Sequence, residues 1–412
     1  MLKKLITATA LISALMVTSA SAETVTMWVR SGIGDSFKEV VKAYNAKGGD
    51  TVEMTEVPFA ELVQKYATAI AGGQAPDALS LDLIYNPAFA AAGQLEDLSD
   101  WAKSLPYFNA LSPSHVKLGT YDGKVYGMPF DSGVTGMYYR KDYLEQAGYK
   151  PEDMQNITWD KFIEIGKAIE AKTGKKMMGL DPNDAGLIRI LMQSASGWYF
   201  DAEGNLTISN NPALKAALET EQKLLQANIY KPTAGWTEWV GSFTSGDVAA
   251  VVTGVWITGT VKAQADQAGK WGVAPIPRMD VEGGTHASNL GGSSWYVMES
   301  SAEKDEAIDF LNEIYAKDND FYQKILTERG AVGSLLAART GEAYQKPDDF
   351  FGGQTVWQNF ADWLVQVPAV NYGIFTNELD TAVTANFPAL VKGTPVDEVL
   401  KAIEDQAAGQ IQ

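Results

Sequence analysis

The spacing of apolar residues in the first part of the chain alternates between a strand pattern and a helix pattern. Runs rich in β-branched and apolar residues predict strands at 24–29, 51–57 and 78–83. Between these runs, apolar positions recur on one helical face, first over 37–44 and then over 59–70. This alternation predicts a largely parallel α/β sheet, in which the loops at the carboxyl ends of the strands form the ligand edge.

Local signals predict where several helices begin and end. The run 36–39, Ser-Phe-Lys-Glu, has the spacing of a capping box, so we expect a helix to begin there. Thr158 is expected to cap a helix that ends at Gly174. Asn211 precedes a helix that carries Pro212 at its first position, where the missing N–H costs nothing.

The second part of the chain continues the same alternation with shorter strands. Residues 201–204 predict a hairpin turn, and 205–209 are expected to be its return strand. Buried strands are predicted at 249–253, 272–274 and 295–298. Helical spacing then returns between Ala307 and Ile314 and again between Val396 and Ile403. No internal repeat or low-complexity tract is visible.

The first 22 residues have the pattern of a cleavable signal peptide. Lys3 and Lys4 precede an apolar run at 5–17, and the small residues of 20–22 predict cleavage after Ala22. This run is too short for an ordinary membrane-spanning helix, and no later apolar stretch is long enough. We therefore expect an exported protein without direct membrane insertion. Because the chain has no Cys for a lipid anchor, a Gram-negative periplasm is favoured.

Length and charge limit the classes of protein further. The roughly 390 residues after the leader exceed what one hydrophobic core usually serves, so two lobes are expected, each with a sizeable core. With 33 basic and 51 acidic residues, the formal net charge is −18. Such a charge argues against nucleic-acid binding and against anionic lipid, although it also suits solubility alone.

No known catalytic or metal-binding pattern is present. The absence of Cys excludes thiol nucleophiles and thiolate metal sites. His115 and His286 are the only histidines and lie far apart in sequence. We therefore expect no metal, no cofactor and no catalytic residues. A secreted glycoside hydrolase stays open as an alternative, since 51 carboxylates always permit an acidic pair.

Five local motifs in a fixed order make the chain resemble the sugar class of extracellular solute-binding proteins of ABC importers, which includes maltodextrin- and lactose-binding proteins. The resemblance covers nearly the whole chain after the leader. The motifs are Ala-Pro-Asp-Ala at 75–78 before a strand that ends at Asp82, Met-Tyr-Tyr-Arg-Lys-Asp at 137–142, Ser-Gly-Trp-Tyr-Phe-Asp at 196–201 leading to Asn211, Phe-Thr-Ser-Gly-Asp at 243–247 leading to Gly-Val-Trp at 254–256, and Gly-Gly-Ser-Ser-Trp at 291–295.

The resemblance implies a fold like the type II periplasmic binding proteins, with two α/β lobes and a ligand cleft between them. It implies three hinge crossings, near 131–135, 289–294 and 330–335, and closure of the lobes on the ligand. The implied function is capture of a mono- or oligosaccharide and its delivery to the membrane permease subunits of an ABC importer, by a protein expected to be a monomer. The implied lobes are 23–132 with 289–332, and 133–288 with 333–412.

A sugar-binding cleft combines aromatic platforms for C–H faces with carboxylates, amides and Arg for hydroxyls. The family pattern points to Asp82 and Tyr85 after the third strand, and to the platforms Trp198 and Trp256. As alternatives, Asp82 could cap a helix or be a solvated loop residue, and the two tryptophans could pack in the cleft wall or the core. Further candidates, each with an ordinary structural role as its alternative, are Arg30, Asp131, Trp236, Glu238, Ser293 and Trp357.

A cationic ligand on the same fold is a second alternative. A polyamine could lie between Trp faces and a carboxylate such as Asp82 or Glu238 through cation–π contacts and ion pairing. The sequence does not say which sugar is bound, because ring number and linkage depend on loops that are far apart along the chain.

Overall fold

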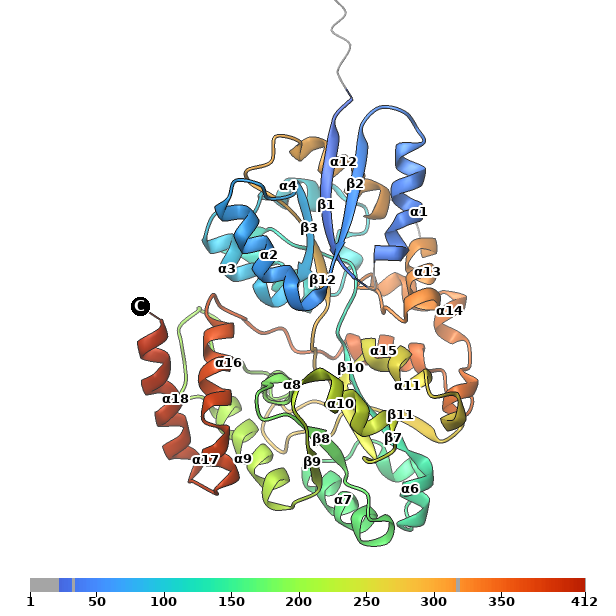
Figure 1. Cartoon of the computed structure of the whole chain (residues 1–412), viewed down its shortest axis with the longest axis vertical. Coiled ribbons are helices and arrows are strands. Elements are labelled where there is room, and N and C mark those ends of the chain that lie inside the picture. The colour runs from blue at the N-terminus through green and yellow to red at the C-terminus, as the bar shows by residue number, and fades with distance from the viewer. Residues whose placement is uncertain (1–21, 32–33, 316–318, 412) are drawn as a thin grey trace, which may run out of the picture.

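The computed structural model describes residues 22–31, 34–315 and 319–411. The leader predicted at 1–22 therefore lies outside the described residues, apart from Ala22. None of the described helices is long and apolar enough to span a membrane. Figure 1 shows two halves, one above the other, each with helices packed around its own sheet.

The first half is built around a mixed five-stranded sheet of order β2-β1-β3-β12-β6. Strands β1, β2 and β3 are parallel and are connected through α1 and α2, as the sequence predicts. Strand β12 joins them much later in the chain and runs antiparallel between β3 and β6. The bounds are β1 Thr24–Arg30, β2 Thr51–Val57, β3 Ala78–Asp82, β6 Met128–Pro129, β12 Ser293–Val297, α1 Gly34–Asn45 and α2 Phe59–Ala71.

The second half is built around an antiparallel three-stranded sheet of order β10-β7-β11 and a parallel pair, β8 and β9. The bounds are β7 Thr135–Arg140, β8 Met178–Leu180, β9 Tyr230–Pro232, β10 Ala250–Gly254 and β11 Trp271–Ala274. A small hairpin of β4 Thr120–Tyr121 and β5 Lys124–Val125 belongs to the first half.

The other helices cover the two sheets and form the C-terminal layer of the second half (Figure 1). Their bounds are α3 Asn86–Ala91, α4 Ser99–Ser104, α5 Pro113–Leu118, α6 Lys141–Gln146, α7 Trp159–Thr173, α8 Gly186–Ser194, α9 Pro212–Gln226, α10 Gly235–Thr244, α11 Thr258–Lys262, α12 Lys304–Tyr315, α13 Asn319–Arg329, α14 Glu342–Gln345, α15 Val356–Leu364, α16 Thr376–Ala385, α17 Phe387–Val391 and α18 Val396–Gln410.

Two of the predicted helix starts are confirmed by their side-chain caps. Thr158 Oγ1 accepts a hydrogen bond from Lys161 N at 3.2 Å, and α7 ends at Gly174 in the left-handed conformation. Asn211 Oδ1 accepts one from Leu214 N at 2.9 Å at the start of α9. The predicted start at 36–39 is wrong, because α1 already begins at Gly34.

The predicted return strand at 205–209 is also wrong. The turn itself forms, since Asn205 N donates to Asp201 Oδ1 at 2.8 Å and Asp201 N donates to Asn205 O at 3.0 Å. The two arms then meet only at a single bridge between Phe200 and Leu206. One bridged pair is too little to make a strand ladder.

Three chain segments pass between the halves side by side. Ser132 N donates to Val332 O at 2.8 Å, which joins the first segment to the third. Leu290 N donates to Gly133 O at 2.8 Å, which joins the second to the first. The bridges Asp131 with Gly333 and Val134 with Asn289 lie at the same places. These hydrogen bonds and bridges join three segments that are far apart in the sequence.

Apolar packing does not stop at the boundary between the halves. One buried cluster continues from β1 through Phe130, Val134 and Leu335 at the crossings into the three-stranded sheet. Another cluster fills the second half and also takes in Leu83, Ile84 and Leu118 from the first half. A third cluster, which includes Leu62, Tyr66 and Leu81, lies within the first half alone. The two halves are thus in direct contact through two of the three clusters.

Candidate functional site

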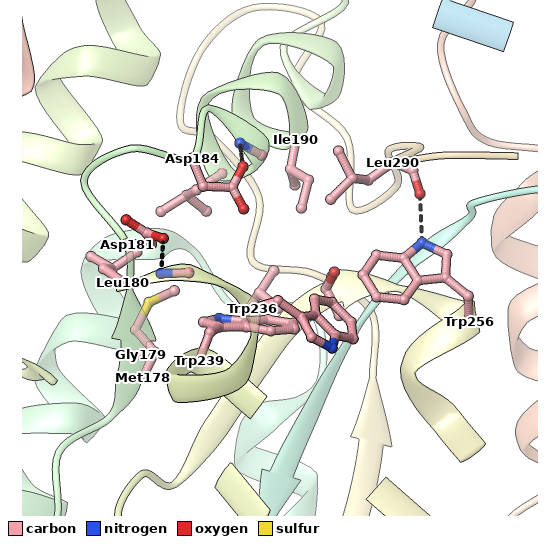
Figure 2. A pocket seen from close by; sticks show the side chains of 15 residues that line it. Met178, Gly179, Leu180, Asp181, Asp184, Ile190, Trp236, Trp239, Trp256 and Leu290 are labelled. Carbon is pink, nitrogen blue, oxygen red and sulfur yellow. Dashed lines mark hydrogen bonds between the residues drawn. The ribbon is translucent and has the colours of Figure 1, made fainter. Parts of the chain in front are cut away.

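Three tryptophans form one wall of a pocket of about 150 Å³ in the second half (Figure 2). Trp236 and Trp239 lie three residues apart on α10, so their rings share a helix face, with ring centroids 5.4 Å apart. Trp256 follows β10, and its ring centroid lies 5.8 Å from that of Trp236. Trp236 is 57% exposed, which leaves a large apolar ring open to a ligand.

Backbone geometry holds the Trp256 ring in place. Its indole Nε1–H donates to Leu290 O in the second crossing at 2.8 Å. A Cβ on Gly254 would lie 2.2 Å from Trp256 Nε1 and 2.7 Å from Leu290 O, so only glycine allows this approach. The tryptophan wall is thereby tied to a segment that crosses between the halves.

Two carboxylates face the tryptophans across the pocket, in loops between β8 and α8 (Figure 2). Asp181 accepts hydrogen bonds from Asn183 N at 2.9 Å and from Gly235 N at 2.6 Å. Asp184 Oδ1 accepts one from Gly186 N at 2.7 Å. Among the described residues, no donor reaches Asp184 Oδ2, so this oxygen is available to a ligand hydroxyl.

A second, much smaller cavity of about 20 Å³ lies between the halves. Asp82 and Ile84 contribute from the first half, and Arg189, Trp198 and Tyr372 from the second. Burial raises the pKa of Asp82 to about 6, while Arg30 and Arg189 favour its charged form. Leu290 lines this cavity as well as the tryptophan pocket, so the two are neighbours.

Five of the ten site residues predicted from sequence lie at these two cavities or next to them. Trp236 and Trp256 line the tryptophan pocket, and Asp82 and Trp198 line the small cavity. Trp198 is only 2% exposed, with its ring 4.5 Å from that of Tyr372 and its Nε1–H donated to Thr376. It is therefore a buried wall and offers no open face. Tyr85 lies on the turn after Asp82, is half-buried and lines neither cavity.

Three further predicted residues, two of them buried and Arg30 partly exposed, form a cluster next to Asp82. Arg30 Nη2 lies 3.5 Å from Asp131 Oδ2. Ser293 N donates to Asp131 Oδ1 at 2.5 Å, and Ser293 is the strand partner of Asp82. Burial raises the pKa of Asp131, while Arg30 counteracts this. The cluster supports Asp82 but lines neither cavity.

The last two predicted residues have local structural contacts. Glu238 Oε2 accepts a hydrogen bond from Ala234 N at 2.9 Å, at the start of its own helix. Trp357 on α15 packs against Gly330 at the third crossing, where a Cβ would lie 2.8 Å from the indole ring. Neither side chain lines a cavity with the other candidates.

The structure adds residues that the sequence predictions did not include. These are Asp181, Asp184, Arg189, Trp239 and Tyr372. Asp181 directly follows the short buried strand β8, and Asp82 is the last residue of β3, so a similar strand-end signal could have identified Asp181. Arg189 gives no such signal, because an Arg on an amphipathic helix is typical of a solvent face. In the described part of the chain, no group of three metal-ligating side chains is found.

Similarity to known proteins extends over the whole chain. The sequence profile described as bacterial extracellular solute-binding protein matches residues 39–351. A lactose-binding protein of Rhizobium radiobacter is 62% identical over 419 residues, which cover 100% of this chain and 99% of the relative. An arabinooligosaccharide-binding protein of Halalkalibacterium halodurans is 26% identical over 396 residues, which cover 92% of this chain and 87% of the relative.

Solved structures share the fold. The galacto-N-biose-/lacto-N-biose I-binding protein of an ABC transporter from Bifidobacterium longum, in complex with lacto-N-biose, has a TM-score of 0.78 at 23% identity, covering 95% of this chain and 97% of that one. The sugar-binding protein MalE of Xanthomonas citri also has a TM-score of 0.78, at 19% identity, covering 94% and 98%. At these identities the likeness concerns the fold alone.

Proposed function

Since the chain belongs to the bacterial extracellular solute-binding proteins, we propose that it captures a disaccharide of the lactose type for import. It is a sugar-binding component of an ABC importer and has the type II periplasmic binding protein fold predicted from its sequence. The choice of a lactose-type sugar follows the relative that is 62% identical. Family membership also supports binding without turnover.

The observation that carries this proposal is the tryptophan wall opposed by carboxylates. The rings of Trp236, Trp239 and Trp256 can pack on the apolar C–H faces of a sugar. Asp181 and Asp184 can accept hydrogen bonds from hydroxyls on the opposite edge, and bonds to ionised acceptors are the stronger ones. An uncharged polyol with one apolar face satisfies both walls.

Pocket size favours a short ligand. The pocket encloses about 150 Å³, whereas pockets for drug-sized molecules usually enclose roughly 300–1,000 Å³. We therefore propose that one sugar ring is held in the tryptophan pocket and that the next ring lies toward the first half.

We further propose that the two lobes are 23–132 with 289–332 and 133–288 with 333–412, and that they close on the ligand by bending at the three crossings. The hydrogen-bonded crossings support this assignment. The permease is then expected to engage the closed form. A cleavable leader at 1–22, a periplasmic location and a monomeric state belong to the same proposal.

Calorimetry with lactose on the purified protein tests the proposal. We expect one site per chain. Trp236→Ala should weaken binding by about 30-fold, because truncating an aromatic anchor typically costs 2 kcal/mol or more. The same substitution should leave the fold intact, since 57% of the residue is already exposed. Circular dichroism checks the fold, and Trp101→Ala in the first half is a control that should bind lactose normally.

The alternatives give different results in the same experiment. Trp faces beside carboxylates also suit a cation, so heat from spermidine and none from any saccharide would favour the polyamine alternative. Release of monosaccharides during incubation would favour a glycoside hydrolase. Unchanged lactose affinity in Trp236→Ala would remove the tryptophan pocket from the proposal.

A further inference from the structure

Helix α8 separates the two cavities. Leu187 and Ile190 line the tryptophan pocket, whereas Arg189 between them lines the small cavity. The crossing segment links the cavities on the other side. A Cβ on Gly291 would lie 3.3 Å from Trp256 Nε1 and 3.7 Å from Asp82 Oδ2. The backbone at Gly291 therefore lies between the indole of Trp256 and the carboxylate of Asp82.

The guanidinium of Arg189 is held in one orientation by Asp380. Its Nε donates to Asp380 Oδ2 at 2.8 Å, and its Nη2 donates to the same oxygen. Tyr199 donates its hydroxyl to Asp380 Oδ1 at 2.8 Å, so both oxygens of Asp380 are occupied. Among the described residues, Nη1 donates to no acceptor. Arg189 thus has donors left for the cavity that it lines.

Asp82 faces Arg189 across this cavity from the other half. The two charges attract each other, but no ion pair within 4 Å forms between them in the described part of the chain. A volume of about 20 Å³ is enough for one water-sized group, which needs roughly 10–15 Å³. The cavity therefore has an acceptor on one side, a donor on the other and room for one small polar group.

A hydroxyl is the group that fits both walls, because it donates to a carboxylate and accepts from a guanidinium. An ammonium would meet the like charge of Arg189, and a carboxylate would meet that of Asp82. Resting on the proposed function, we propose that one hydroxyl of the saccharide in the tryptophan pocket bridges Asp82 and Arg189. Arg189 is then a specificity-determining residue, and the bridge joins the two halves only around an uncharged ligand.

A double-mutant cycle between ligand and protein tests this bridge. Calorimetry compares lactose with its monodeoxy derivatives on wild type, Arg189→Lys and Asp82→Asn. Lysine lacks the second terminal nitrogen, Nη1, with which Arg189 can reach the cavity while its Nε and Nη2 pair with Asp380. On wild type, removal of one particular hydroxyl should weaken binding by about 10-fold or more, as expected for a hydrogen bond to charged groups. On both variants, the same removal should change affinity by about 2-fold at most.

Matched controls are available in the second half. Arg278 and Asp280 form a salt bridge at 3.4 Å that lines neither cavity. Arg278→Lys and Asp280→Asn should keep the wild-type response to every deoxy sugar. Melting temperatures of all variants show whether Arg189→Lys has disturbed the fold, and Asp82→Asn gives an independent readout if it has.

The outcomes separate this proposal from the one before it. If lactose gives no heat, the tightest saccharide in a panel and its monodeoxy forms take its place. No binding of any saccharide to wild type overturns the proposed function, and the bridge with it. A different result overturns the bridge alone: each deoxy sugar loses the same affinity, relative to the parent sugar, on wild type, Arg189→Lys and Asp82→Asn. The cavity would then hold water.

Discussion

Glu221 on α9 is 2% exposed, and burial raises its pKa to about 8, with Asp184 adding to the effect. Its ordinary pKa is 4.5, so between pH 4.5 and 8 the folded chain holds a proton that the unfolded chain releases. The free energy of unfolding attributable to this group therefore falls as pH rises through that window. Glu221 thus destabilises the protein at neutral pH.

We expect Glu221→Gln to remove this loss of stability. Relative to wild type, the variant should gain little at pH 5 and most at pH 8, by at most several kcal/mol, since one pKa unit corresponds to about 1.4 kcal/mol. Denaturant unfolding at both pH values measures it. Glu219→Gln, an exposed neighbour on the same helix, should show no such difference. An equal change at both pH values would contradict the role of the buried charge.

Asp82 should make ligand binding depend on pH. Its pKa of about 6 reflects burial, opposed by Arg30 and Arg189 and assisted by Asp131. At pH 5 roughly a tenth of the molecules carry the ionised acceptor, so the Kd for lactose should be about 10-fold higher than at pH 7.5. The Asp82→Asn variant should bind lactose more weakly than wild type at neutral pH, and its Kd should change little between pH 5 and pH 7.5. A wild-type Kd that is constant over this range would argue against Asp82 as the hydroxyl acceptor.

Residue types predicted the chemistry of the site better than they predicted which residues line it. Aromatic platforms and carboxylates were expected, and Trp236 with Trp256 do share a pocket. The sequence could not distinguish the exposed ring of Trp236 from the buried ring of Trp198, because burial depends on Tyr372, which lies far along the chain. Arg189 was missed for the same reason, since its partner Asp380 is 191 residues away.

At the scale of elements, substitution of glycines tests how the backbone conformation at a helix end affects stability. Gly174 ends α7 with φ of 70°, and a Cβ there would meet no atom within 4 Å. Gly174→Ala should therefore lower the free energy of unfolding by about 1–2 kcal/mol through backbone strain alone. In contrast, Gly259→Ala on α11, also with open space around it, should be neutral or stabilising by up to about 1 kcal/mol. Thermal unfolding of the two variants compares backbone strain at Gly174 with helix propensity at Gly259. Equal effects on stability would contradict the left-handed conformation of Gly174.

Periodicity and capping signals predicted most elements because each depends on neighbouring residues. The strands β1, β2 and β3 and the ends of α7 follow directly from such local patterns. The segment 205–209 has a strand-like composition, but a strand also needs a partner along its length, and here pairing stops after one bridge. Local sequence does not contain that information.

At the scale of the molecule, the side chain of Asn289 joins the first two crossing segments to His115 of the first half. Its Oδ1 accepts from Gly133 N at 2.9 Å and lies 3.1 Å from His115 Nε2. Its Nδ2 donates to Gly291 O at 2.7 Å. Since Oδ1 is an acceptor, His115 must carry its proton on Nε2, and burial lowers its pKa to about 4. No local sequence pattern indicated this connection between the segments.

The contact between halves predicts a measurable change in shape. Leu118 of the first half is 3% exposed and packs in the core cluster of the second. Leu118→Ala should weaken that contact and favour a more open form. The affinity for lactose should then fall in proportion to the decrease in the fraction of closed molecules. Small-angle scattering should show a larger radius of gyration for the ligand-free variant than for wild type, and compaction of both on adding lactose. Identical scattering curves throughout would exclude hinge closure.

The position of β12 has a consequence for biosynthesis. It occupies the place between β3 and β6, although it is made more than 150 residues after either of them. Until residue 297 has been translated, the N-terminal sheet lacks its inner strand β12. The edges of β3 and β6 that pair with β12 then have no partner strand. Pairing at such sequence separation is slow. The N-terminal sheet of the nascent polypeptide therefore stays incomplete through most of its synthesis. If the chain is exported as proposed, this delay would keep that part unfolded, as passage through a translocation pore requires.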